Sequence, residues 1–297
     1  MSTAEAWTIQ KIIDWTTKHF VSKGISSARL DTELLLARAL SCRRLDLYLK
    51  FDQPLKNEEL STFKEMVKRR SQKEPVAYIL GEKEFYGRGF SVGPGVLVPR
   101  PETEHLIDEV LTWVKQGGFT YNELRILDVG SGSGCIGLTL AAELPNARVV
   151  LLDSSQVACS FTESNALKLG VSEVVEVINQ DFESYAQSTT EQFDIVASNP
   201  PYIGTLVKSE LQEDVRRYEP EQALFGGSRG DELINRWMPS YIKLLKPLGL
   251  LVFEIGSDQG EVAKKILADS KDLDQGRLAA DYSGHPRIVR AIRKENL

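Results

Sequence analysis

The stretch Arg125-Ile-Leu-Asp-Val-Gly-Ser-Gly-Ser-Gly-Cys-Ile-Gly137 predicts the fold of the larger part of the chain. Its first five residues predict an apolar strand, glycines alternate with serines after it, and a helix is expected over about 134–143. Glycine permits a positive φ and a close approach of the backbone to a ligand, and open α/β sheets bind ligands at the carboxyl ends of their strands. We therefore expect this loop to hold a cofactor.

Strands and helices alternate on the C-terminal side of the loop. The expected strands are 149–152, 174–177, 193–198 and 250–255, followed by two short strands that close the chain, and the expected helices are 155–169, 230–246 and 258–269. Another helix is expected before the loop, over about 103–116. This alternation predicts an α/β fold with a mainly parallel sheet that helices cover on both faces.

The first part of the chain predicts helices only. Apolar residues recur at helical spacing in 5–22, 27–40 and 57–71, and the run Lys68-Arg69-Arg70 is interpreted as a solvated helix face. After it, 78–81 and 85–92 suggest short strands with glycine turns, as in a hairpin. The expected organisation is a helical domain at 1–75, a linker with a β-hairpin at 76–98 and an α/β domain at 99–297.

Composition and charge narrow the class of protein. The 297 residues suit one large and one smaller domain, and 42% hydrophobic and 26% charged residues are ordinary for a globular protein. A net charge of -6 argues against binding through nucleic-acid phosphates, so no direct nucleic-acid partner is expected. The three cysteines form no C-x-x-C pair, which argues against zinc or disulfides and favours a reducing cytoplasm. Residues 1–5 do not resemble a leader, and no run reaches the ~18 apolar residues of a membrane span.

Acidic residues beside the glycine loop favour S-adenosylmethionine as the cofactor. Asp128 ends its strand where it could meet a positively charged methionine amine, although a turn-stabilising carboxylate is the alternative. Asp153 ends the next strand, where it could accept both ribose hydroxyls, but it would serve NAD equally well. Asp181 and Phe182 could bind an adenine amine and its ring, unless Phe182 is plain core. The candidate cofactor residues are Asp128, Gly130, Ser131, Gly132, Ser133, Gly134, Asp153, Asp181, Phe182 and Asn199.

The segment Asn199-Pro200-Pro201-Tyr202 directly follows the expected strand 193–198. Its prolines cannot continue a central strand and hold the loop extended. The Asn199 side-chain oxygen and the Pro200 carbonyl could accept both N–H bonds of an amide or aromatic amine, and Tyr202 could stack on that planar group. Catalysis would then rest on positioning and fixed dipoles, with Asn199, Pro200 and Tyr202 as catalytic residues and no metal.

Several segments together resemble the protein-glutamine N5-methyltransferases of peptide chain release factors, the HemK/PrmC family. The segments are 98–104 (Val-Pro-Arg-Pro-Glu-Thr-Glu), 128–137, 199–202, Asp214-Val-Arg216, Tyr218-Glu219-Pro220 and Asp281-x-x-Gly284-x-x-Arg287. The resemblance implies a class I, Rossmann-like S-adenosylmethionine-dependent methyltransferase fold with a seven-stranded, mainly parallel sheet. It implies methyl transfer from S-adenosylmethionine, leaving S-adenosylhomocysteine, to the glutamine of the Gly-Gly-Gln loop of class 1 release factors, which the N-terminal helices would help to hold.

The resemblance also assigns roles to residues. It implies that 130–134, Asp153 and Phe182 contact the cofactor, although family members often carry Trp at the Phe182 position. Asn199, Pro200, Pro201 and Tyr202 would hold the glutamine, and Arg100, Glu102 and Thr103 would lie beside the active site. For Arg100 and Glu102 a salt-bridged structural part is the alternative to substrate binding.

Three other functions compete with this interpretation. A nucleic-acid amino methyltransferase, acting on adenine N6 or guanine N2, shares Asn-Pro-Pro-Tyr, but the acidic pI of about 5.4 argues against it. A non-catalytic release-factor or ribosome-binding protein that has kept the fold is the second, and the intact glycine loop and Asn-Pro-Pro-Tyr argue against it. Because Gly132-x-Gly134-x-x-Gly137 also satisfies the dinucleotide fingerprint, an NAD-dependent oxidoreductase is the third, and it leaves 199–202 unexplained.

Overall fold

The structure, a computed structural model, describes residues 7–117, 123–274, 276–281 and 283–295. The chain divides into two compact units, which are described separately: Met1–Gly81 with Gln212–Tyr218, and Glu82–Leu211 with Glu219–Leu297. Residues 1–5, where no leader is expected, lie outside the described residues, as do the first two residues of the helix expected over 5–22. None of the helices in the described ranges has the length and apolar character needed to span a membrane.

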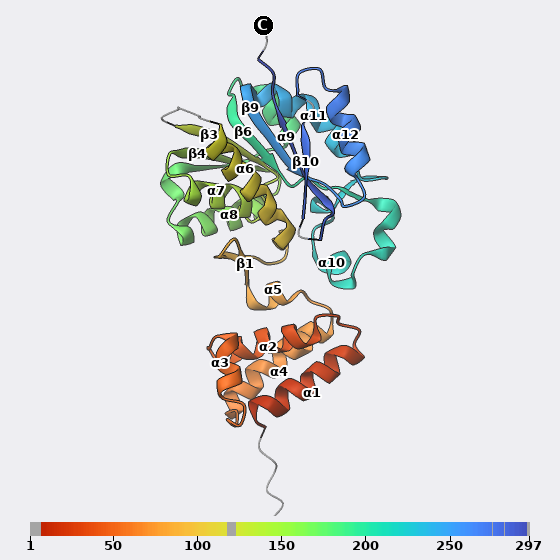
Figure 1. Cartoon of the computed structure of the whole chain (residues 1–297). Helices are drawn as coiled ribbons and strands as arrows, with labels where there is room; N and C mark the ends of the chain where they lie inside the picture. Colours follow the sequence, from red (N-terminus) through yellow and green to blue (C-terminus); the bar gives the residue numbers. More distant parts are fainter. Residues whose placement is uncertain (1–6, 118–122, 275, 282, 296–297) are drawn as a thin grey trace, which may run out of the picture. The chain divides into compact units, whose positions relative to one another are not determined.

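The first unit is helical, as the apolar periodicity predicts (Figure 1). Its helices are α1 (Ile9–Ser22), α2 (Ala28–Ala39), α3 (Arg44–Leu49), α4 (Asn57–Ser71), α5 (Val76–Leu80) and α10 (Glu213–Tyr218). Thr8 caps α1 by accepting a hydrogen bond from the Lys11 amide, and Ile9, Ile13 and Phe20 of this helix enter the core of the unit. The six residues of α3 were not expected because they are too few to establish a helical period.

The segment Val76–Leu80 forms helix α5, so the strand expected at 78–81 is wrong. The Pro75 carbonyl accepts bonds from the amides of Tyr78 and Ile79, and Gly81 ends the helix at φ +71°. The expected hairpin is confirmed, but it begins after Gly81 and consists of β1 (Glu82–Phe85) and β2 (Arg88–Ser91). Its turn residues Tyr86 and Gly87 both have positive φ, as a tight hairpin turn requires.

Arg70 is buried, so the expectation of a solvated face fails at this residue. Each nitrogen of its guanidinium has a different partner in the first unit: Nε bonds Asp31 at 2.7 Å, Nη1 bonds the Glu74 carbonyl at 3.1 Å and Nη2 bonds Asp214 at 3.3 Å. Asp214 belongs to α10, which lies 144 residues further along the chain. The charge run could not reveal this role, because the partners are distant in sequence.

We expect Arg70→Lys to lower the free energy of unfolding of the first unit by about 1–2 kcal/mol, because one ammonium cannot replace three guanidinium bonds. Segment-resolved hydrogen exchange of α2 and α4 at increasing urea measures this change. Arg69→Lys is the matched control, since the exposed Arg69 guanidinium pairs with Glu74 alone among the described residues and its change should cost less than about 1 kcal/mol. Equal losses from both substitutions would contradict a special role for Arg70.

The second unit is built on a seven-stranded sheet, which confirms the expected fold class. Its strands are β3 (Leu124–Val129), β4 (Ala147–Asp153), β5 (Val175–Asn179), β6 (Phe193–Ser198), β9 (Leu245–Glu254), β10 (Arg277–Ala280) and β11 (Pro286–Ile292). Their order is β10-β11-β9-β6-β3-β4-β5. Neighbouring strands from β5 to β9 pair in parallel, whereas β11 is antiparallel to both β9 and β10.

Helices cover both faces of this sheet (Figure 1). On one face lie α6 (Glu104–Gln116), α7 (Cys135–Glu143) and α8 (Gln156–Leu169), and on the other α9 (Phe182–Ser188), α11 (Glu232–Leu244) and α12 (Gly260–Asp269). Successive residues of β3 alternate between the two cores, with Ile126 in one and Leu127 in the other.

The order in which the strands are added to the sheet changes direction at β3, which makes β3 a topological switch point. From β3 the chain lays down β4 and β5 on one side, and then returns to the other side for β6. In sheets of this kind the carboxyl ends of the strands at such a switch point form the ligand crevice. The glycine loop follows β3 and Asn199 follows β6, so the fold brings both to this crevice.

Candidate active site

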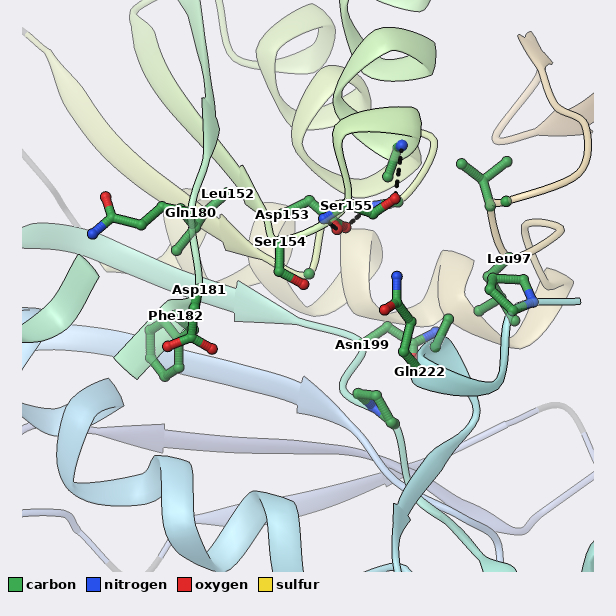
Figure 2. A pocket seen from close by; sticks show the side chains of 18 of the residues that line it. Leu97, Leu152, Asp153, Ser154, Ser155, Gln180, Asp181, Phe182, Asn199 and Gln222 are labelled. Atoms are coloured by element: carbon green, nitrogen blue, oxygen red, sulfur yellow. Dashed lines mark hydrogen bonds between the residues drawn. The ribbon is translucent and has the colours of Figure 1, made fainter. Parts of the chain in front are cut away.

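A cavity opens at the carboxyl ends of β3, β4 and β6 in the second unit (Figure 2). Asp153 lies in the middle of the view, with Asp181 and Phe182 on one side and Asn199 and Gln222 on the other. The lining residues are Gly95, Val96, Leu97, Gly130, Gly132, Leu152, Asp153, Ser154, Ser155, Ala158, Gln180, Asp181, Phe182, Asn199, Pro201, Pro220, Gln222, Ala223 and Trp237. Six of the residues expected to contact a cofactor are among them: Gly130, Gly132, Asp153, Asp181, Phe182 and Asn199.

The glycine loop is folded onto the end of β4. The amides of Gly130 and Ser131 donate to the Leu152 carbonyl at 2.8 and 3.1 Å, and the amide of Gly132 donates to the Asp153 carboxylate at 2.9 Å. Gly130 and Gly132 have positive φ, and no atom lies within 4 Å of where a Cβ would stand. Because these two positions carry no side chain, the cavity stays open beside the loop. Gly134 differs, because its Cβ would meet Leu138 at 2.7 Å, which makes it a packing position.

The Asp153 carboxylate is held in place by backbone donors. Oδ1 accepts from the Ser155 amide at 2.8 Å and Oδ2 from the Gly132 amide at 2.9 Å. Burial raises the pKa of this carboxyl, and the two backbone bonds oppose that shift. Each oxygen keeps a second lone pair, so the group can accept two further hydroxyl donors from the cavity. That arrangement fits the vicinal diol of a ribose.

An aromatic wall bounds the Asp181 side of the cavity. The Asp181 carboxylate caps α9 by accepting from the Ser184 amide at 3.0 Å. Phe182 packs against Trp237 and Tyr241, with ring centroids 5.1 and 5.0 Å apart, and it also lines the cavity. Phe182 is thus both core and cavity wall, and the flat apolar surface beside a carboxylate fits an adenine.

Four expected cofactor residues lie outside the cavity lining: Gly134, which packs against Leu138, and the buried Asp128, Ser131 and Ser133. Asp128 Oδ2 accepts from the Gly137 amide at 2.9 Å, so the turn-stabilising role weighed for it is present. Its Oδ1 and the hydroxyls of Ser131 and Ser133 have no partner in the described part of the chain. Burial raises the pKa of Asp128 to about 7, and the nearby Asp153 charge adds to the shift. This buried carboxylate oxygen, which has no partner among the described residues, would suit a positively charged ligand bound at the glycine loop.

The Asn199 amide nitrogen is bonded to Thr103, which is not among the residues that line the cavity. Nδ2 donates to Thr103 Oγ1 at 3.2 Å, and among the described residues nothing donates to Asn199 Oδ1 or to the Asn199 and Pro200 carbonyls. Asn199 and Pro201 line the cavity, whereas Tyr202 lines a neighbouring hollow with Leu206 and Val207. The Tyr202 hydroxyl donates to Glu254 at 2.9 Å. The stacking role expected for Tyr202 stays a prediction.

Arg100 is tied into a salt bridge, the structural part weighed for it in the sequence. Its guanidinium donates to the Glu219 carboxylate at 2.7 Å, and the Val98 amide donates to the other Glu219 oxygen at 3.2 Å. Because Glu219 precedes Pro220 of the cavity wall, this pair joins the segments 98–104 and 218–220. Glu102 is half-buried, and its substrate-binding role stays a prediction.

Two family models match the chain: a PrmC N-terminal domain over residues 11–81 and a methyltransferase small domain over residues 114–215. Curated relatives match over nearly the full length. A release factor glutamine methyltransferase of Geobacter sulfurreducens is 41% identical over 96% of each chain, and one of Rhodopirellula baltica is 37% identical over 95% of each chain. The chain belongs to the release factor glutamine methyltransferase family. Among solved structures, it is similar to a ribosomal protein L11 methylase from Lactobacillus delbrueckii subsp. bulgaricus, at 18% identity and a TM-score of 0.44 over 66% of this chain and 81% of that one.

Sequence reasoning missed several residues of this methyltransferase site. Glu254, Glu219 and Trp237 were not among the candidates, nor was the wall segment 95–97. Glu254 carried a usable signal, because it is the one acid in the apolar strand 250–255 and stands near its carboxyl end, where ligands of such sheets bind. Trp237 and 95–97 offered no comparable signal, since only tertiary packing brings them to the cavity.

Proposed function

We propose that this chain transfers a methyl group from S-adenosylmethionine to the side-chain amide nitrogen, N5, of the glutamine in the Gly-Gly-Gln loop of class 1 peptide chain release factors. Membership of the release factor glutamine methyltransferase family supports this substrate. The observation that carries the chemistry is at the cavity that fits the cofactor: within the described residues, Asn199 Oδ1 and the two carbonyls beside it have no donor.

The amide acceptors explain how a poor nucleophile can react. The lone pair of a glutamine nitrogen is delocalised into its carbonyl, and this resonance holds the nitrogen planar. Asn199 Oδ1 and the Pro200 carbonyl would accept its two N–H bonds, which favours a more pyramidal nitrogen. Because these acceptors are fixed by a proline-stiffened loop, they cost no reorganisation when the reaction occurs. The Tyr202 ring would bound the planar amide group.

The residues of the cavity would hold the cofactor by its three parts. Asp153 would accept the ribose hydroxyls, Asp181 and Phe182 would bind the adenine, and Gly130 and Gly132 would let the methionine portion approach the backbone. When bound, the cofactor supplies an electrophilic methyl group on a sulfonium. The Asp128 carboxylate would attract the positively charged amine of the cofactor's methionine portion. No general base is needed before transfer, because the amide proton leaves after the nitrogen is alkylated.

The helical first unit would help to hold the release factor, and the protein would act in the cytoplasm, where release factors work. The match of residues 11–81 to a PrmC N-terminal domain model supports a dedicated role for the unit.

Methyl transfer from labelled S-adenosylmethionine tests the proposal. We expect label on a purified class 1 release factor, none on its Gln-to-Ala variant in the Gly-Gly-Gln loop, and none on duplex DNA or ribosomal RNA. Label on nucleic acid without label on the release factor would support the amino methyltransferase alternative instead. Cofactor binding without transfer to any substrate would favour a non-catalytic binding protein.

A further inference from the structure

A buried carboxylate links the two halves of the expected substrate site. Glu254 ends β9, next to β6 in the sheet, and is 1% exposed. Its Oε2 accepts from the Thr103 hydroxyl at 2.5 Å and its Oε1 from the Tyr202 hydroxyl at 2.9 Å. Thr103 in turn accepts from Asn199 Nδ2 at 3.2 Å. Asn199 and Tyr202, which leave the sheet on the same loop, are thus anchored to a single acid on the neighbouring strand.

The number of protons in this network sets the direction of each bond. Both oxygens of Glu254 accept in this network, so Thr103 and Tyr202 each direct their hydroxyl proton at the acid. Thr103 has one proton, and once it is given to Glu254 the hydroxyl can only accept from Asn199. Only the NH2 side of the Asn199 amide can therefore face Thr103. The carbamoyl oxygen is left on the opposite side of the group, where an amide donor can meet it.

The orientation of Asn199 is no longer enforced if residue 254 cannot accept from both hydroxyls. When Thr103 does not donate to Glu254, its proton can point at Asn199, and the amide can turn over to present its NH2 group to the substrate nitrogen. Two donors would then face each other. Burial raises the pKa of Glu254, whereas the hydroxyls of Thr103 and Tyr202 and the charge of Arg287 oppose the shift, and Glu102 adds to it. The two hydroxyl bonds favour the ionised form of the acid, against the effect of burial.

We propose that Thr103 and Glu254 are positioning residues that fix the Asn199 carbamoyl oxygen toward the methyl-accepting amide, with Tyr202 held by the same carboxylate. This inference rests on the proposed function, because it assigns how the acceptor of that reaction is oriented. Neither residue needs to touch the substrate. Their effect is on the orientation of Asn199, so it is expected in the rate of transfer and not in the binding of the cofactor.

Four variants of the full chain, at Thr103, Thr139 and Glu254, test the inference. Thr103→Val removes the hydroxyl at nearly constant shape, and Thr103→Ser restores it. Thr139→Val is the matched control, because the Thr139 hydroxyl is equally buried in the same unit and has no partner among the described residues. Single-turnover transfer to a purified release factor gives the rate, isothermal titration with S-adenosylmethionine gives the dissociation constant, and thermal unfolding shows whether each variant is folded.

We expect Thr103→Val to lower the single-turnover rate about tenfold at saturating release factor, the effect of one lost hydrogen bond, with an unchanged cofactor dissociation constant. Thr103→Ser should recover most of the rate, and Thr139→Val should keep it. Glu254→Gln should lose at least as much as Thr103→Val, because an amide offers one acceptor for two hydroxyls.

The outcomes separate this inference from the function on which it rests. If the wild-type chain does not label the release factor, the proposed function fails and the inference falls with it. If the wild type labels it and Thr103→Val is equally fast, only the positioning role is overturned. A Thr103→Val variant that loses rate without recovery in Thr103→Ser, or that loses cofactor affinity to the same extent, likewise overturns it, since a merely structural threonine would behave in that way.

Discussion

Asn199→Ala is expected to lower the single-turnover rate of methyl transfer by about 10²–10³-fold, by analogy with removing one oxyanion-hole donor. The substitution deletes the side-chain oxygen that is free to accept from the substrate amide, while the Pro200 carbonyl remains. Cofactor affinity should change little, because Asn199 is one of many residues around the cavity and the groups that fit the ribose and adenine are elsewhere. Single-turnover kinetics with saturating cofactor and release factor, together with titration calorimetry, measure both quantities.

Asn235→Ala is the control for this experiment. Asn235 is exposed on α11, where its amide bonds the Asp231 carbonyl, and it does not line the cavity. Its substitution should leave the rate and the cofactor affinity unchanged. If Asn199→Ala lost cofactor affinity as strongly as rate, Asn199 would be a cofactor residue and its assignment to the methyl acceptor would be wrong.

The sheet and its covering helices could be predicted from sequence, because each strand is a short apolar run and each helix has one apolar face. Prediction failed where a segment was too short to show a helical or strand periodicity. The run Tyr78-Ile79-Leu80 is apolar enough for a strand, but Pro75 and Gly81 are spaced for one turn of helix. The four residues that follow pair in the hairpin instead. Local propensity could not separate these outcomes, since both end at a glycine.

The residues of the site that could be predicted from sequence are those at the carboxyl ends of strands. Asp153 and Asn199 reach the cavity because each stands at the carboxyl end of a central parallel strand. Thr103 and Glu219 reach Asn199 and Arg100 from distant segments, and their pairing depends on how those segments pack. Asp128 was correctly placed at a strand end. Its complete burial, and the lack of a partner for one of its oxygens among the described residues, could be found only in the packed structure.

Asp128→Asn is expected to stabilise the protein without cofactor at pH 8, by on the order of 2–4 kcal/mol. In the unfolded chain this carboxyl titrates at about 3.9. In the folded protein burial raises its pKa to about 7, against the opposing bond from Gly137. Between these values the folded state keeps a proton that the unfolded state has released. Stability therefore falls as the pH rises through this window, and the loss is complete above about pH 7.

Asparagine keeps the oxygen that accepts from Gly137 but cannot ionise, so it removes this pH-dependent loss. Urea unfolding without cofactor should show a larger gain from Asp128→Asn at pH 8 than at pH 5. The same variant should bind S-adenosylmethionine roughly tenfold more weakly at pH 8, because the negative charge that favours a cationic amine is gone. Stability and cofactor affinity should thus change in opposite directions.

Asp194→Asn separates this effect from the general consequence of altering a buried acid. Asp194 is equally buried, but it lies near the start of β6, away from the cavity, and it is paired with Lys246 at 2.8 Å. Its substitution removes the buried charge that pairs with Lys246, so it should destabilise the protein at both pH values and leave cofactor affinity unchanged. If Asp128→Asn behaved like Asp194→Asn, the Asp128 carboxylate would be a structural group that the fold requires in its charged form. If its gain were the same at pH 5 and pH 8, the raised pKa would be wrong, because only an acid that titrates in this window makes the difference depend on pH.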